Sequence, residues 1–215
     1  MRARNVAVAL SILLLWISVR VSQPSTPNVS HDLPPDIVPG ASIGPIRLGD
    51  DEKRVVEELS DFPKIVQQVT YPMCGTIRMT EWFDKALLQT GLFIYLRKNG
   101  VFQIESETTR FRTAEGITEH SLPEDVERHY PNMEAYELLS SASDLVGNRN
   151  LIYWVDRDRG IAFGYYYNTQ KRRRLVFRVI IFQPKTDFRP NGCVTRPQEL
   201  RRLRPYSLDP PANSA

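Results

Sequence analysis

The chain contains 215 residues, of which 41% are hydrophobic and 25% are charged, and this globular composition excludes a disordered, collagen-like or multi-span membrane protein. Two cysteines are too few for a small disulfide-rich scaffold, and the length allows one or two domains. The formal net charge is +3, from 28 Lys and Arg against 25 Asp and Glu.

The first 23 residues have the pattern of a targeting segment. Arg2 and Arg4 precede an apolar stretch at 6–19 that only two serines interrupt, as in a secretory signal peptide. As a helix this stretch spans roughly 21 Å, less than the roughly 30 Å hydrocarbon core of a membrane. We predict an exported protein, periplasmic or extracellular. A cleaved signal and a short inner-membrane anchor both remain open, because cleavage after Ser22 leaves an arginine where a small residue is expected.

The positive net charge belongs to this segment. Residues 1–23 carry three arginines and no acid, so the remainder of the chain is neutral. Residues 24–148 carry 11 basic and 20 acidic side chains, whereas residues 149–215 carry 14 and 5. Such an asymmetry is typical of proteins that bind an anionic partner, and also of folds whose two halves attract each other. The equal numbers of basic and acidic side chains in residues 24–215 favour the second interpretation. We expect no nucleic-acid partner.

Prolines mark the limits of the predicted folded part. Five of the 16 prolines lie at 24–39 and six at 184–215. We predict a proline-rich linker at 24–39, a folded domain at 40–183, and a proline- and arginine-rich tail at 184–215.

Within the predicted domain, two segments share the same order of elements, a short helix and then strands. The helices are predicted to begin at Asp50 and Ser121, with Ser121 and Glu124 in a capping box. The predicted strands are 80–83, 91–96 and 101–106, then 151–155, 160–165 and 175–182. We therefore predict an α+β fold built from a duplicated helix-then-strands unit, about 40–110 and 111–183, with an antiparallel sheet and helices on one face.

Burial selects the strand register of the first hairpin. A three-residue loop at 98–100 pairs Leu96 with Phe102 and Ile94 with Ile104, whereas a two-residue loop pairs apolar with polar residues. We therefore predict the three-residue loop. The predicted inner face consists of Leu92, Ile94, Leu96, Phe102 and Ile104, and of Ile161, Phe163, Tyr165, Leu175, Phe177, Val179 and Ile181.

The opposite face of the predicted sheet combines aromatic and arginine side chains. Its candidate binding residues are Phe93, Tyr95, Arg97, Gln103, Tyr166, Arg178, Ile180 and Phe182. Two interpretations are open for so apolar a face. Either a loop or the C-terminal tail covers it, or it is a solvent-facing surface that binds a partner.

Short motifs resemble a family of exported bacterial proteins. The run Pro39–Gly49, followed by a short helix, and its echo at Glu115-Gly116-Ile117 resemble the β-lactamase-inhibitory-protein-like group, which includes the small SmpA/OmlA outer-membrane proteins. In that group helical segments pack on one face of an antiparallel sheet, often in tandem. The resemblance covers roughly residues 39–183 and implies a non-enzymatic binding or assembly role.

A single pair of cysteines in an exported chain, Cys74 and Cys193, favours a disulfide over two free thiols. The segment Asp156–Gly160 is typical of a hairpin turn rather than a calcium loop. The basic loop at Lys171, Arg172, Arg173 and Arg174 is either a solvated hairpin tip or a contact for an anionic surface.

No catalytic motif or metal-ligand set is apparent, so we expect no catalytic residue, no metal and no cofactor. The leading hypothesis is an exported, non-enzymatic protein that binds another protein or an envelope component through the solvent-facing side of its sheet. The alternative is a structural or assembly factor held near the membrane by its N-terminal segment and by Arg201, Arg202 and Arg204. An enzyme with a carboxylate site at Glu105, Glu107 or Asp156 ranks third.

Overall fold

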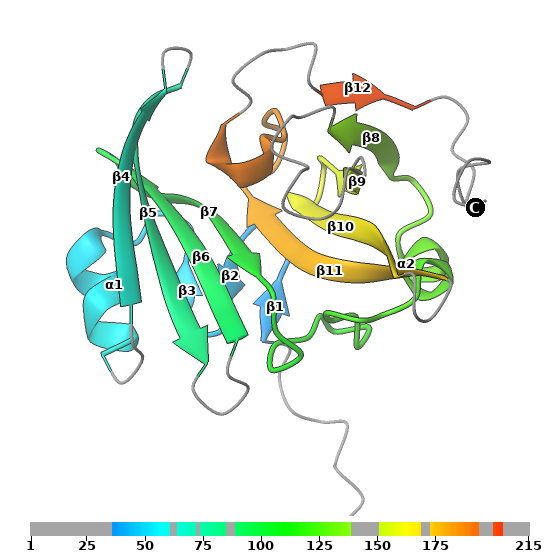
Figure 1. Ribbon diagram of the computed structural model, residues 1–215, viewed down its shortest axis with the longest axis horizontal. Coiled ribbons are helices and arrows are strands. Elements are labelled where there is room, and N and C mark those ends of the chain that lie inside the picture. The colour runs from blue at the N-terminus through cyan, green and yellow to red at the C-terminus, as the bar shows by residue number, and fades with distance from the viewer. Residues whose placement is uncertain are drawn as a thin grey trace, which may run out of the picture. The chain divides into compact units, whose positions relative to one another are not determined.

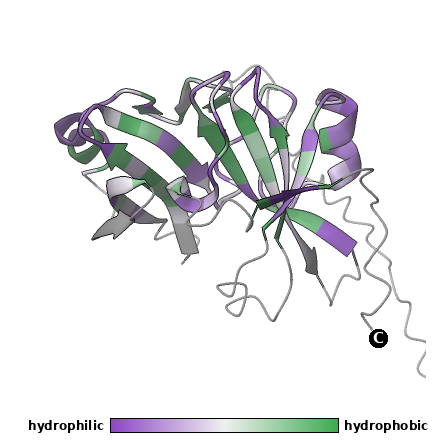
Figure 2. Ribbon diagram, turned by 90° about the horizontal axis from the view of Figure 1, so that it is seen from above, coloured by the Kyte–Doolittle hydropathy of each residue, from purple (hydrophilic) through white to green (hydrophobic). Residues whose placement is uncertain are grey.

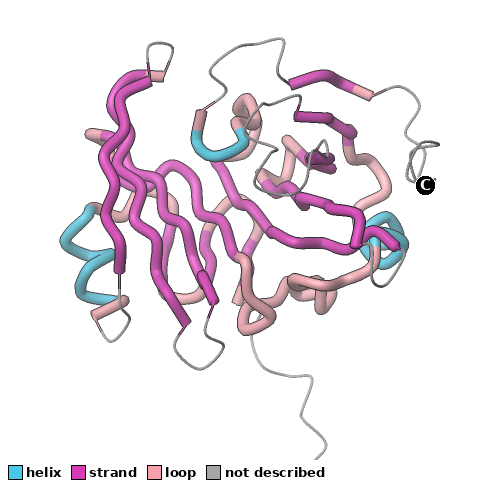
Figure 3. The backbone as a smooth tube through the Cα atoms, viewed as in Figure 1, coloured by secondary structure: helices cyan, strands magenta, loops and turns pink. Residues whose placement is uncertain are grey.

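The computed structural model describes residues 36–60, 64–71, 74–84, 89–138, 151–168, 173–193 and 200–203. These residues form a small and a large antiparallel sheet, two α-helices and a 3₁₀ turn (Figure 1, Figure 3). The helices and the turn are α1 (Glu52–Glu58), α2 (Pro123–His129) and η2 (Pro190–Gly192). The small sheet contains β1 (Ile37–Val38), β2 (Ser42–Ile43) and β3 (Ile46–Arg47). The strands of the large sheet are β4 (Lys64–Tyr71), β5 (Gly75–Asp84), β6 (Gln89–Arg97), β7 (Gly100–Ser106), β8 (Glu134–Leu138), β9 (Leu151–Asp156), β10 (Ile161–Asn168), β11 (Arg173–Phe182) and β12 (Leu200–Arg202).

Each helix is followed in the chain by four strands of the large sheet. Helix α1 precedes β4 to β7, and α2 precedes β8 to β11. The strand order is β12-β8-β9-β10-β11-β7-β6-β5-β4, so the two runs meet where β7 pairs with β11. Figure 1 shows the first run from teal to green and the second from green to orange. The expectation of an α+β fold with an antiparallel sheet is confirmed.

Strands β4 and β8 are absent from the predicted set. In β8 the acids Glu134 and Glu137 break the apolar alternation that identifies a half-buried strand. Their charges are neutralised from outside the strand, since Arg202 bonds Glu134 and Arg201 bonds Glu137. Because both arginines lie in β12, the tail supplies the edge strand that stabilises β8.

One buried cluster joins the small sheet, both helices and one face of the large sheet. From the helices it includes Val55, Leu59, Val126 and Tyr130. From the strands it includes Ile37, Ile43, Ile46, Leu92, Ile94, Leu96, Val101, Ile104, Ile161, Phe163, Tyr165, Val176, Val179 and Ile181. Figure 2 shows hydrophobic residues concentrated along the strands, whereas the helices are largely hydrophilic. We call the sheet face that contacts this cluster the inner face and its opposite the outer face.

The segments that lead into the two helices make the same contacts with the sheet. The carbonyl of Val101 accepts a hydrogen bond from the amide of Gly49 at 2.7 Å. The amide of Val101 donates to the carbonyl of Asp50 at 2.8 Å. Val176 makes the equivalent pair of bonds. Its carbonyl accepts from the amide of His120 at 2.7 Å, and its amide donates to the carbonyl of Ser121 at 3.0 Å. Gly49 and His120 both adopt positive φ angles, 93° and 69°.

A β-bulge corrects the predicted register of the first hairpin. The turn has two residues rather than three, and Leu96 pairs with Val101 instead of Phe102. Phe102 is the extra residue of the bulge, and beyond it the strands return to the predicted pairing. Phe102 therefore lies on the outer face, where the guanidinium of Arg97 is 4.0 Å from its ring centroid.

The second hairpin has an equivalent bulge. Tyr165 pairs with Val176, and the extra residue is Phe177. Val176 takes the core position for which Leu175 and Phe177 are predicted. The ring of Phe177 lies instead against Tyr153 on the outer face, with ring centroids 6.4 Å apart.

The helix starts also differ from the predicted ones. Asp51 rather than Asp50 caps α1, because its side chain accepts from the amide three residues later at 2.8 Å. Helix α2 begins after Leu122 with no side-chain cap. The predicted capping box is absent because the hydroxyl of Ser121 accepts from the amide of Thr118 instead.

The folded part extends beyond residues 40–183 on both sides. Ile37 of β1 is fully buried, and β12 pairs with β8. The predicted disulfide is present, and it joins Cys74, just before β5, to Cys193, just after η2. Among the described residues, no helix is long and apolar enough to cross a membrane. The predicted targeting segment and proline-rich linker lie outside the described residues, apart from the last four linker positions.

Candidate functional site

The segment Gln183–Cys193, which we call the covering loop, lies over the outer face. Phe188 of this loop packs between Tyr153 and Phe182, with ring centroids 5.3 and 5.6 Å apart. Near the end of the loop, the backbone of Gly192 lies so close to Tyr95 that an added Cβ would be 2.6 Å from the ring. The disulfide then ties the end of the loop to the start of β5.

The covering loop overturns the expectation that the outer face is open to solvent. Of the eight candidate binding residues, Tyr95, Gln103, Ile180 and Phe182 are buried. Phe93, Tyr166 and Arg178 are partly buried, and Arg97 is exposed. The interpretation that the tail covers this face therefore describes the structure, because Phe188 of the loop and the aromatic side chains of the sheet remove each other from water.

A charged network lies beneath the loop. The guanidinium of Arg178 bonds the carboxylates of Glu105 and Glu107, and it also donates to Asn191 Oδ1 at 2.9 Å. The Arg178 side chain is 12% exposed and that of Glu105 is fully buried. Gln103 Nε2 donates to Glu105 Oε1 at 2.7 Å. Arg178 thus connects both strands at the centre of the sheet to the covering loop.

The network shifts the pKa values of its members. Burial raises the pKa of Glu105, and the bonds from Arg178 and Gln103 offset this only in part. Burial also lowers the pKa of Arg178, but the charges of Glu105 and Glu107 outweigh burial and raise it overall. Arg178 therefore stays charged, and one cation serves two carboxylates.

A pocket of about 350 Å³ opens between the covering loop and the first hairpin. The hairpin contributes Arg97, Phe102 and Gln103, and β11 contributes Phe182. The covering loop contributes Gln183, Thr186, Asp187 and Arg189. The pocket therefore combines two aromatic rings, two amides and two guanidinium groups at a place that the loop creates.

The two arginines are the unusual feature of this pocket. Neither Arg97 nor Arg189 forms an ion pair with a carboxylate in the described part of the chain, and Arg189 lies 3.9 Å from the sulfur of Cys74. Burial, followed by the charge of Arg189, lowers the pKa of Arg97. The two cations therefore repel each other across the pocket, and an anion between them would relieve this repulsion.

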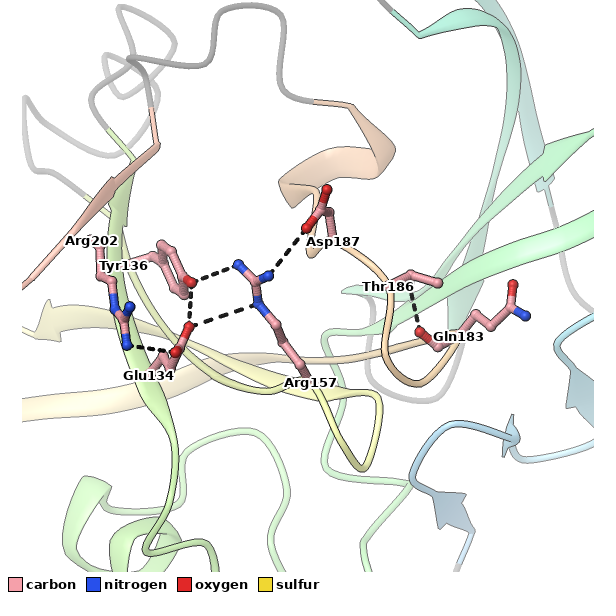
Figure 4. Close-up of polar contacts among 7 residues, drawn as sticks. All are labelled: Glu134, Tyr136, Arg157, Gln183, Thr186, Asp187 and Arg202. Carbon is pink, nitrogen blue, oxygen red and sulfur yellow. Dashed lines mark hydrogen bonds and ion pairs between the residues drawn. The ribbon is translucent and has the colours of Figure 1, made fainter.

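The carboxylate that lines the pocket, Asp187, forms an ion pair with an arginine outside the pocket. Figure 4 shows Arg157, from the turn after β9, between Asp187 and the β8 residues Glu134 and Tyr136. Arg157 Nη1 bonds Asp187 Oδ1 at 3.1 Å, and Nη2 donates to the Tyr136 hydroxyl at 2.7 Å. The Thr186 hydroxyl donates to the carbonyl of Gln183 at 2.6 Å and closes the turn of the loop. Arg157 therefore links the Asp187 side of the pocket to β8.

The remaining candidate residues do not gather at one site. Glu105 and Glu107 bind Arg178, and Asp156 closes the hairpin turn by accepting from the amide of Arg159 at 3.0 Å. The turn interpretation of Asp156–Gly160 is thus confirmed. The tail arginines Arg201 and Arg202 bond acids of β8, and Arg204 lies outside the described residues.

The basic loop is only partly described. Arg173 and Arg174 begin β11, and Lys171 and Arg172 lie outside the described residues. In the described ranges, no group of three or more His, Cys, Asp and Glu side chains has the arrangement of a metal site.

Sequence reasoning missed the covering-loop half of the pocket. Thr186, Asp187 and Arg189 stand in a polar, proline-flanked stretch with no periodic pattern. The available signal was Cys193, because a bridge to Cys74 must bring this stretch against the start of the first sheet strands.

Comparisons with known proteins identify no family. No family model matches the chain, and no curated protein matches it. Among solved structures, the chain is similar to the crystal structure of the uncharacterized protein yfeY from Escherichia coli, with a TM-score of 0.47 and 10% identity. The similarity covers 67% of this chain and 97% of that one.

Proposed function

We propose that the protein is an exported, non-enzymatic binding protein that recognises its partner at the pocket beneath the covering loop. The observation that carries this proposal is the pair Arg97 and Arg189, two guanidinium groups that face one cavity with no carboxylate partner in the described part of the chain. Polar groups that converge in a concave, partly apolar site are typical of a binding site. The Cys74–Cys193 bridge supports export, because disulfides persist mainly outside the cytosol.

We also propose that the two helix-then-strands runs are copies of one unit, with both helices on the inner face. Four observations support this proposal. Val101 and Val176 make the same bonds with the segments before the helices. The bulges fall at Phe102 and Phe177, and both helices contribute to one core cluster. Glu105 pairs with Ile180, which is the residue at the equivalent position, so the copies would be related by a two-fold axis at this pair.

Duplication explains where the pocket lies. The covering loop follows β11 only, whereas the chain after β7 leads into the second unit. A site made by this loop is therefore a departure from the symmetry, and it uses the hairpin of the first unit as its floor. The short motifs at Pro39–Gly49 and Glu115–Ile117 add the resemblance to the β-lactamase-inhibitory-protein-like group, in which a binding or assembly role is expected.

The test is capture of a partner from an envelope extract by the purified full chain. The Arg97→Gln/Arg189→Gln variant removes both pocket cations. The matched control, Arg54→Gln/Arg128→Gln, removes two cations that pair with acids on the surfaces of α1 and α2. We expect the wild type and the control to retain the same partner, identified by mass spectrometry, and the pocket variant to lose it. Equal capture by all three folded proteins would reject the pocket as the binding site.

A further inference from the structure

The chemistry of the pocket restricts the class of its ligand. We infer that the pocket binds an oxyanion, a carboxylate or a phosphate, carried on an apolar stem about the size of one aromatic amino acid. This inference rests on the proposed function, because it names the group that the partner or small molecule would insert.

The charges of the lining favour an anion. Arg97 and Arg189 contribute two cations, whereas the carboxylate of Asp187 is bonded to Arg157 at 3.1 Å. A guanidinium presents parallel N–H donors that match the two oxygens of a carboxylate or phosphate. Arg97 is also oriented in advance, because its guanidinium stacks over the ring of Phe102 with 4.0 Å to the centroid. A ligand oxyanion would therefore meet donors that are already in place.

The remaining lining favours an apolar stem with a hydrogen-bond donor. The partly buried ring of Phe102 supplies the apolar surface, and the ring of Phe182 lies behind it with only 3% of that residue exposed. Gln103 uses its amide nitrogen to bond Glu105 at 2.7 Å, which orients the side chain and leaves the carbonyl oxygen as an acceptor. This acceptor suits an N–H group next to the anion, as in an acylated amino acid or the end of a peptide.

The volume limits the size of the inserted group. About 350 Å³ is at the lower end of the range for small-molecule sites, roughly 300–1,000 Å³. It fits one aromatic amino acid with its terminal anion. The covering loop bounds the space on one side, so a flat protein surface does not fill it.

Calorimetric titration of the full, disulfide-bonded chain tests this inference with three probes. N-acetylphenylalanine carries a carboxylate, N-acetylphenylalaninamide is its neutral counterpart, and phenyl phosphate carries the other oxyanion. We expect at least one oxyanion probe to bind about tenfold or more tighter than the amide. The Arg97→Gln/Arg189→Gln variant should lose this binding, the Arg54→Gln/Arg128→Gln control should retain it, and added salt should weaken it. Equal urea midpoints would show that both variants are folded.

The outcomes separate this inference from the proposed function. Tighter binding of the carboxylate or of the phosphate probe supports the inference and identifies the source of the anion. Equal binding of the amide, or oxyanion binding that survives loss of both arginines, overturns it. If no oxyanion probe binds while partner capture still requires Arg97 and Arg189, the proposed function stands and the ligand class is wrong. If a probe binds but capture is unchanged in the variant, the ligand class stands and the partner site lies elsewhere.

Discussion

Replacing Arg178 with methionine should destabilise the protein by about 3–5 kcal/mol at neutral pH. Arg178 is the cation that compensates Glu105, whose side chain is fully buried beneath the covering loop. Without it, Glu105 keeps only the bond from Gln103 within the described part of the chain. Methionine preserves much of the contact with the rings of Phe93 and Phe177, which lie 4.8 and 5.3 Å from the guanidinium. The lost stability should therefore come from the uncompensated charge of Glu105 and not from a cavity.

A second substitution separates charge from packing. In the Arg178→Met background, Glu105→Gln removes the buried charge and keeps a group that can bond Gln103. We expect this double variant to recover most of the lost stability, leaving a deficit of about 1–2 kcal/mol from the missing hydrogen bonds. The assay is urea unfolding followed by tryptophan fluorescence, with the free energy obtained by linear extrapolation.

The dependence on pH supplies an independent check. Burial already raises the pKa of Glu105 in the wild type, and loss of the neighbouring cation raises it further. A carboxyl whose pKa is higher in the folded than in the unfolded state destabilises the fold as the pH rises through the folded pKa. The deficit of Arg178→Met should therefore shrink when the pH is lowered from about 8 to about 5. A deficit below about 1 kcal/mol at neutral pH, or no recovery in the double variant, would refute this reasoning.

Three further predictions concern the outer face and its cover. The Cys74→Ser/Cys193→Ser variant opens a loop of sequence separation 119 and should lose about 5 kcal/mol in the chain-entropy model, so a loss below 1 kcal/mol in urea would contradict it. Gly192→Ala should lower the urea midpoint more than Gly116→Ala. Both glycines have positive φ, but only at Gly192 would the added methyl group clash with a ring, that of Tyr95. Equal shifts would show that the Tyr95 ring moves aside without cost. Tyr153→Phe should leave thermal stability unchanged or slightly raised, because this buried hydroxyl has no hydrogen-bond partner among the described residues, and a loss above about 1 kcal/mol would reveal one.

Local pattern predicted the strands where apolar residues alternate without interruption. Ile94 and Ile104 are paired and buried as expected, and Ile161 and Ile181 are buried on the inner face as expected. The pattern did not predict which residues face the core at the bulges. A bulge turns one residue to the core in place of its neighbour, and the composition of the strand does not show this. The core accepted Val101 and left Phe102 to the outer face, a choice that depends on aromatic and arginine partners far along the chain.

The covering of the outer face was the harder part to predict. The loop that covers it has few apolar residues, and its burial depends on Phe188 and Gly192, neither of which belongs to a periodic pattern. The disulfide was predictable from the single pair of cysteines and the predicted export alone. The pocket was not, because it needs the loop, the bulge at Phe102 and the ion pair that holds Asp187 to be present together.

The position of the disulfide determines how the folded chain would respond to tension. Strands β5 to β11 and helix α2 lie between Cys74 and Cys193, so force applied to the two ends would pass through the sulfur bridge and not through these elements. Among the described elements, the small sheet, α1, β4 and β12 lie outside the bridge and could be peeled away. Because the bridge closes a loop of sequence separation 119, the pulled chain would be shorter by roughly 400 Å, at about 3.4 Å per residue, than the same chain without the bridge. All residues that line the pocket lie within this cross-linked loop, so a pull on the two ends would leave them covalently tied together.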